Sequence, residues 1–171
     1  DALGSVGQEI DGISKCLMAE RVDVSSIDAM RAFADKVHAT VPAVDILVNN
    51  AGVGLMGTIL SSSYEDWQWI LGINLWGVIH GCHVFVPEMA ARGNGGHVVN
   101  ISSMLGYNPS PDVVGYSTAK FGVFGLSTCM RSELCDHNIG VSVICPGVIN
   151  TNITKNARIK AKAQGLVPIS V

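Results

Sequence analysis

Two side chains four residues apart, Tyr116 and Lys120, could together carry out acid–base chemistry. On a helix this spacing places both on one face, within reach of the same small molecule. A phenol loses its proton at a pKa of about 10 and an ammonium at about 10.4, and a lysine cation beside a tyrosine favours the phenolate and lowers the tyrosine's pKa. The pair therefore predicts a tyrosine that exchanges a proton with a carbonyl or alcohol oxygen near neutral pH. The same spacing also occurs in an ordinary amphipathic helix, so other motifs in the sequence are needed to distinguish the two interpretations.

Four further motifs accompany this pair in a fixed order. Asn49-Asn50-Ala51-Gly52 follows one apolar run, Asn74 lies in an amphipathic segment, Ser103 ends a second apolar run thirteen residues before Tyr116, and Pro146-Gly147-Val148-Ile149-Asn150-Thr151 follows a third. Over roughly residues 16–154, this order and spacing resemble the short-chain dehydrogenase/reductase family, with its NNAG, Asn, Ser, Tyr-x-x-x-Lys and PG-x-x-x-T signatures. The resemblance implies an oxidoreductase that transfers a hydride between a nicotinamide cofactor and a carbonyl or alcohol carbon.

Four catalytic roles follow from the resemblance. Tyr116 is implied as the acid/base, and Lys120 as the residue that bonds the nicotinamide ribose and lowers the tyrosine's pKa. Ser103 is implied to orient the substrate; Ser102 is the rival, but the thirteen-residue spacing favours Ser103. Asn74 resembles the asparagine that holds a water in the proton relay, and an asparagine is costly to bury without hydrogen-bond partners.

The cofactor set is also implied by the resemblance. It comprises Tyr116 and Lys120 with Asp23, Val24, Asn50, Ala51, Gly52, Pro146, Gly147, Ile149 and Thr151. Within it, Asp23 and Val24 match the pair that holds the adenine, although a plain strand-end aspartate is a serious alternative for Asp23. Glycine at position 52 would let the backbone approach the ligand closely. The expected cofactor is NAD or NADP, with NAD favoured. The residue that discriminates between them ends the second strand of such a domain, which we expect this chain to lack.

The residues expected near the substrate are mostly apolar. The primary set is Ser103, Met104, Leu105, Tyr107 and Val148, with Leu55, Met56, Pro109, Val113 and Val114 nearby. This lining favours a lipophilic alcohol or ketone over a sugar or charged metabolite, although such loops can also simply pack together. The run 146–153 also resembles the reductase half of actinobacterial proteins in which this domain follows an α/β-hydrolase domain.

The elements that must position these residues alternate along the chain. Strands are expected at residues 17–24, 44–48, 98–101 and 141–145, and helices at residues 1–10, 27–40, 64–92 and 113–137. The continuous apolar run 44–48 is typical of a strand buried on both faces. The pattern predicts one domain over residues 1–171, an α/β doubly wound, Rossmann-like parallel sheet with helices on both faces and ligand at the carboxyl ends of its strands.

One feature of such a domain is missing from the sequence. No Gly-x-x-x-Gly-x-Gly phosphate loop follows a strand, so we expect the chain to lack the family's N-terminal βαβ portion and its C-terminal end. The alternatives are a non-catalytic dinucleotide-binding or scaffold protein, and a dimerisation module. The helices at 64–92 and 113–137 carry apolar surface beyond one face, and we expect a homodimer or homotetramer through them.

Composition narrows the remaining possibilities. Net charge is −3 and the 11 Lys+Arg are scattered, so nucleic acid is not an expected partner. The uncharged stretch within 64–92 is expected to be a buried or interface helix rather than a membrane span, and no signal peptide is evident. Five cysteines without a Cys-x-x-Cys pair suggest reduced thiols and a cytoplasmic protein. His80 and His83 have helical spacing but no obvious third ligand, so no metal is expected.

Overall fold

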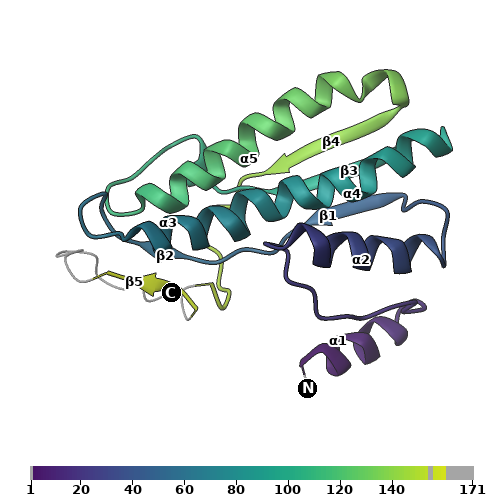
Figure 1. Ribbon diagram of the computed structural model, residues 1–171, viewed down its shortest axis with the longest axis horizontal. Helices are drawn as coiled ribbons and strands as arrows, with labels where there is room; N and C mark the ends of the chain where they lie inside the picture. The colour runs from purple at the N-terminus through teal and green to yellow at the C-terminus, as the bar shows by residue number, and fades with distance from the viewer. Residues whose placement is uncertain (1, 154–155, 161–171) are drawn as a thin grey trace.

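The computed structural model describes residues 2–153 and 156–160, and these form a parallel sheet with a layer of helices packed on it (Figure 1). Strands β1 (Ile46–Asn49), β3 (Gly96–Ile101) and β4 (Ile139–Ile144) lie in the order β1-β3-β4, with both neighbouring pairs parallel. Parallel neighbours require crossover connections, which the helices supply. This confirms the predicted α/β, Rossmann-like fold.

The helices begin and end close to the predicted positions. They are α1 (Ala2–Asp11), α2 (Ile27–His38), α3 (Tyr64–Leu71), α4 (Gly77–Arg92) and α5 (Val114–Glu133), with a π-helical turn, η1 (Gly72–Trp76), joining α3 to α4. Ser26 caps α2 by accepting a hydrogen bond from the backbone N–H of Ala29. The predicted first helix start, at residue 1, and the end of the predicted domain, at 161–171, lie outside the described residues.

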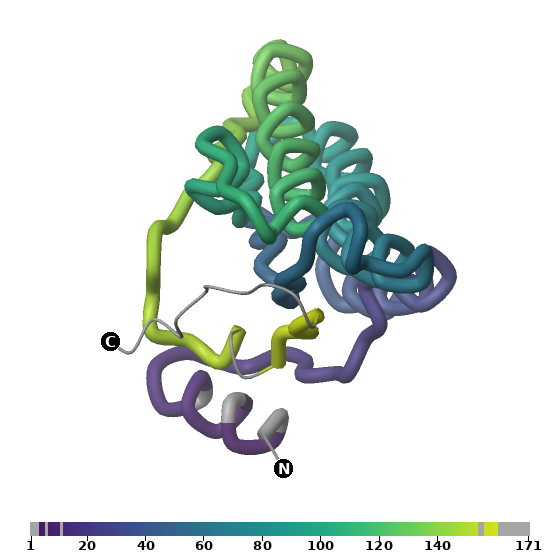
Figure 2. The backbone as a smooth tube through the Cα atoms, turned by 90° about the vertical axis from the view of Figure 1, so that its left-hand side faces the viewer, coloured from purple at the N-terminus to yellow at the C-terminus, as the bar shows by residue number. Residues whose placement is uncertain are grey.

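The core lies between one face of the sheet and the helices α2, α4 and α5. One buried cluster joins α4 and α5 to the central strands through residues such as Met89, Val98 and Val123. A second joins α2 to α4 through Met30, Ala34 and Phe85. Helix α1 lies apart from this layer (Figure 2).

Two sequence predictions are wrong. Residues 17–24 form no strand; a strand needs a partner for its ladder, and no described strand lies beside this segment. Strand β1 is not buried on both faces, because Ile46 and Val48 are 64% and 55% exposed. Within the described residues, the helices cover only the face of β1 that carries Leu47.

Two short elements were not predicted. Strand β2 (Leu55–Met56) follows β1, and β5 (Arg158–Ile159) pairs with it in parallel, below the helices in Figure 1.

The helical run Tyr64–Arg92 is long and apolar enough to cross a membrane, but by length and composition only. Because its side chains at Ile70, Phe85 and Met89 are buried in the core, it is a core helix here.

Candidate active site

The predicted motifs converge at the carboxyl ends of the three sheet strands. Beyond β3, the backbone N–H of Ser102 donates to Ile144 O at 2.8 Å, and that of Met104 donates to Pro146 O at 2.9 Å. These two bonds hold the Ser102–Ser103 turn beside the Pro146-Gly147 motif. The turn after β1 lies close by, because a Cβ at Gly52 would stand 3.7 Å from Lys120 Nζ and 3.5 Å from Asn74 Oδ1.

Tyr116 and Lys120 share one face of α5, as their spacing predicts. Lys120 Nζ lies 5.8 Å from the centroid of the Tyr116 ring. The ammonium also donates to Ile101 O at 2.8 Å, at the end of β3. Lys120 is therefore buried with one backbone partner and still borders both the tyrosine and the Gly52 turn.

The ionisation of the pair differs from the expected pattern. Burial raises the pKa of Tyr116, and a side-chain hydrogen bond with Ser103 opposes that rise only in part. The predicted lowering of the Tyr116 pKa is thus wrong for this arrangement, because desolvation of the phenolate is the largest cause and Ser103, not Lys120, is the side chain that opposes it. Burial also lowers the pKa of Lys120 to about 8, a shift opposed by the charge of Cys145. The phenol consequently carries its proton at neutral pH and can act as a donor.

Asn74 is fully buried within the π-helical turn, and both ends of its amide are satisfied. Its Nδ2 donates to Val53 O at 2.8 Å, and its Oδ1 accepts from Val53 N at 2.9 Å. Single π turns inside α-helices are frequent at functional sites. Here the π turn presents Asn74 to the backbone after Gly52, so this side chain fixes the path of the NNAG turn.

Ser103 is buried beside Tyr116 at the start of a short 3-10 turn, Met104–Gly106. Its Oγ accepts from Leu105 N at 3.2 Å. Ser102 instead donates to Lys120 O at 2.8 Å, which is a structural contact with α5. The turn approaches α5 so closely that a Cβ at Gly106 would lie 2.8 Å from Lys120 O. The geometry therefore supports Ser103 over Ser102 as the tyrosine's partner.

A buried amide network underlies this end of the sheet. Asn49 Nδ2 donates to Asn100 Oδ1 at 2.8 Å, and Asn100 Nδ2 donates to Ser127 Oγ at 3.0 Å. The network links β1, β3 and α5 just before the turns that carry Gly52 and Ser103. Helix α4 reaches it through Gly81, where a Cβ would lie 2.1 Å from Asn49 Oδ1.

The implied cofactor residues fall into two groups. Asn50, Ala51 and Gly52 form an exposed turn beside Lys120, and a second group follows β4 at the same end of the sheet, consisting of Pro146, Gly147, Ile149 and Thr151. Asp23 and Val24 lie elsewhere: the Asp23 carboxylate accepts from Ser25 N and Oγ at 3.0 and 2.7 Å, and Val24 O contacts His80 Nδ1 at 2.9 Å. No described contact brings them to the Gly52 turn, so their adenine role stays a prediction.

Only some of the implied substrate residues lie near Ser103. Met104 and Val148 are exposed near Ser103, and Met104 Sδ would lie 3.8 Å from a Cβ at Gly147. Tyr107 is also exposed, but its ring lies 6.3 Å from that of Phe124. A cavity of about 570 Å³ lies between the loop 109–112 and the α5 face of Val114 and Phe121, and neither Tyr116 nor Lys120 lines it. We therefore assign the chemistry to the strand ends rather than to this cavity.

Among the described residues, no cluster of three His, Cys, Asp or Glu side chains could hold a metal ion. His80 is engaged by Val24 O and lies against Trp76, with ring centroids 5.8 Å apart. Sequence reasoning missed Val53, Ile101 and Gly106 as site-building residues. The first two act through backbone atoms and leave no sequence signal, whereas the glycine could have marked a close approach.

Comparisons with known proteins agree with this geometry. The family model for short chain dehydrogenases matches residues 1–162. The chain is 44% identical over 132 residues to "Probable oxidoreductase EphD" of Mycobacterium tuberculosis, which covers 77% of this chain and 22% of EphD. Among solved structures, it is similar to a short chain dehydrogenase/reductase from Burkholderia phymatum in complex with NAD (32% identity, TM-score 0.86, 91% of this chain and 56% of that one).

A metagenomic short-chain oxidoreductase in complex with NADP is also similar, with 36% identity and a TM-score of 0.79 over 85% of this chain and 66% of that one. The chain spans between 22% and 60% of the length of several curated relatives that it matches.

Proposed function

The chain belongs to the short-chain dehydrogenase family, and from that premise we propose that the protein is an oxidoreductase that transfers a hydride between NAD or NADP and a carbonyl or alcohol carbon. The observation that carries the proposal is the convergence of Ser103, Tyr116 and Lys120 beside the Gly52 turn. A scaffold protein has no physical need to bury a lysine beside a tyrosine and a serine at the carboxyl ends of strands.

The described residues fit the ribose and nicotinamide side of such a cofactor. Gly52 leaves open the space that a Cβ would fill next to Lys120 Nζ, and the ammonium and the Tyr116 hydroxyl suit ribose hydroxyl groups as partners. When bound, the cofactor supplies the hydride acceptor or donor. NAD and NADP complexes of the two similar structures support either cofactor, and we weakly favour NAD.

The chain's own residues would manage the proton and the substrate oxygen. In reduction, Ser103 donates a hydrogen bond to the carbonyl oxygen, and Tyr116 gives its proton to that oxygen as negative charge develops. The raised pKa of Tyr116 keeps the proton in place beforehand. Lys120, held by Ile101 O, supplies positive charge that stabilises the resulting phenolate. Oxidation runs through the same contacts in reverse.

We propose a lipophilic alcohol or ketone as the substrate. Support comes from the apolar side chains of Met104, Leu105 and Val148 near Ser103. No charged side chain lies among the predicted substrate residues, so a charged metabolite would find no partner there. We also propose a cytoplasmic homodimer or homotetramer formed through the helices at 64–92 and 113–137.

The Tyr116→Phe variant tests the proposed function in the whole protein. Loss of the hydroxyl should lower turnover of apolar ketones, such as cyclohexanone and 2-octanone, by about 10²–10⁴-fold. The affinity for NADH or NADPH, measured by fluorescence titration, should change little because the ring remains. Tyr64→Phe, at an exposed tyrosine on α3 outside the candidate site, is the matched control and should keep normal turnover. A Tyr116→Phe enzyme with near wild-type turnover would contradict the assignment.

A further inference from the structure

The described chain that follows β4 is hydrogen-bonded beside Ser103 and again at β5. At its start, Pro146 O accepts from Met104 N at 2.9 Å, and its far end forms β5. There, Arg158 N donates to Gly54 O at 3.0 Å and Lys160 N donates to Met56 O at 2.9 Å. The segment therefore runs from the Ser103 side of the site to strand β2, which follows the Gly52 turn.

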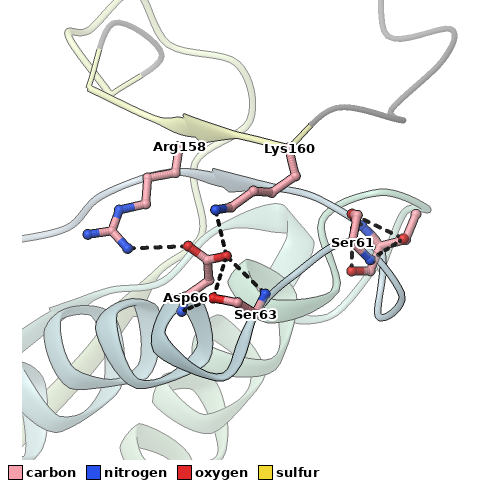
Figure 3. Close-up of polar contacts among 6 residues, drawn as sticks. Ser61, Ser63, Asp66, Arg158 and Lys160 are labelled. Atoms are coloured by element: carbon pink, nitrogen blue, oxygen red, sulfur yellow. Dashed lines mark hydrogen bonds and ion pairs between the residues drawn. The ribbon is translucent and has the colours of Figure 1, made fainter.

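A single buried carboxylate, Asp66, anchors the far end of this segment (Figure 3). Its Oδ1 lies 3.3 Å from Arg158 Nη1, and its Oδ2 lies 2.7 Å from Lys160 Nζ. Arg158 and Lys160 are two residues apart in the extended segment, so both side chains reach the same side. The Asp66 side chain is only 3% exposed, whereas its two cationic partners are partly exposed.

The helix cap alone does not explain this arrangement. Asp66 and Ser63 form a capping box at the start of α3, in which Asp66 Oδ2 accepts from Ser63 N at 3.0 Å. That role needs one oxygen and no burial. A buried carboxylate is costly unless it is paired, and here Lys160 is the largest cause that lowers the pKa of Asp66 to about 2. The paired cations are thus what make the buried position tolerable.

Residues around Arg158 and Lys160 contact the segment closely. The guanidinium carbon of Arg158 lies 3.9 Å from the centroid of the Trp69 ring, in a cation–π contact. A Cβ at Gly54 would lie 2.8 Å from Ala157 Cβ, and one at Gly57 would lie 3.2 Å from Lys160 Cγ. The two glycines therefore permit a close approach that larger residues would prevent.

We propose that Asp66 is a positioning residue, which anchors residues 156–160 through Arg158 and Lys160. Because Asn156 N donates to Asn152 O at 3.1 Å, this anchor also holds Ile149 and Thr151 toward the bound cofactor. This inference rests on the proposed function, because Ile149 and Thr151 matter only if a nicotinamide cofactor binds beside them. Asp66 lies on α3 and would act entirely through the segment that it holds.

The test compares variants of the whole protein by hydrogen exchange without cofactor and by NADH and NADPH titration. Asp66→Asn keeps one acceptor oxygen for Ser63 N but loses the charge, and the double variant Arg158→Gln/Lys160→Gln leaves the cap untouched. In both, the amides of Arg158 and Lys160 should exchange about tenfold faster or more, α3 should stay protected, and the Kd for the preferred cofactor should rise about tenfold. Asp28→Asn, at an exposed first-turn aspartate paired with Arg31, is the matched control and should change neither readout.

A charge-conserving variant distinguishes a positioning role of the Asp66 anchor from a purely structural one. Lys160→Arg, which keeps the charge, should retain wild-type affinity, whereas Lys160→Gln should not. Faster exchange with unchanged cofactor Kd would overturn the positioning role, and so would unchanged exchange at Arg158 and Lys160. If α3 itself loses protection in Asp66→Asn, the double variant is used instead, and its exchange at positions 158 and 160 and its cofactor Kd are interpreted by the same criteria. Failure of the wild-type protein to bind NADH or NADPH would instead overturn the proposed function, and this proposal with it.

Discussion

The burial of Lys120 in the candidate site lowers the stability of the fold. Its ammonium is buried with one described hydrogen bond, to Ile101 O, and burial lowers its pKa to about 8. A depressed lysine pKa means that the folded state disfavours the cation relative to the unfolded chain. Such a cost is common where a charge is needed for chemistry, because stability and activity compete at these sites.

This cost predicts a specific pH dependence. Between about pH 8 and pH 10.4 the unfolded chain binds more protons at Lys120 than the folded chain, so the free energy of unfolding should rise with pH, by up to on the order of 3 kcal/mol. Lys120→Met should lack this rise, be no less stable than wild type at pH 7, and have lost turnover. Urea unfolding of both proteins at pH 7, 9 and 10.5 measures the difference. Parallel pH profiles for the two proteins would contradict the prediction.

At the scale of elements, local sequence patterns predicted most of the helices and sheet strands. The helix expected at residues 27–40 corresponds to α2, and apolar runs predicted β1, β3 and β4. Residues 17–24 have a strand-like pattern but no described partner strand, because a ladder depends on distant segments rather than on local propensity. Likewise, apolar composition could not reveal which face of β1 the helices would cover.

The candidate site was predictable where its signal lies in side chains and spacing. Ser103, Tyr116 and Lys120 lie together as expected, and the buried side chain of Asn74 is hydrogen-bonded to Val53. The contacts that hold them are backbone atoms of Val53 and Ile101, which any residue could provide. The Asp66 anchor was also missed, because the pairing of Asp66 with Arg158 spans most of the chain and no local pattern marks it.

The amide network predicts how tightly α4 must pack on the strand ends. Gly81→Ala would place a Cβ 2.1 Å from Asn49 Oδ1, so we expect it to lower the free energy of unfolding by about 1–3 kcal/mol. Gly72→Ala is the matched control, since its Cβ would meet only Ser25 Cβ at 3.6 Å, and it should be neutral or stabilising by up to about 1 kcal/mol. Chemical denaturation measures both. Equal stability of the two variants would show that the network adjusts freely.

At the scale of the whole molecule, the outer side of the helical layer carries apolar surface that the described chain leaves open. Phe121 and Phe124 on α5 are 42% and 36% exposed, and a Cβ at Gly125 would meet nothing within 4 Å. Contiguous exposed apolar residues often mark an interface, and a small residue lets a second helix approach. A two-fold arrangement would place the same face of α5 on both copies, which fits the proposed dimer.

Charged substitutions on this face should therefore separate the subunits. Phe121→Glu and Phe124→Glu would each place a carboxylate in the proposed interface on both copies, so the cost of burying this charge should weaken association by about tenfold or more. Sedimentation velocity at several protein concentrations measures the shift from dimer or tetramer to monomer. Ile13→Glu, at an exposed position outside the helical layer, should leave the assembly unchanged. A wild-type protein that sediments strictly as a monomer, or Phe variants that remain fully associated, would rule out α5 as the interface.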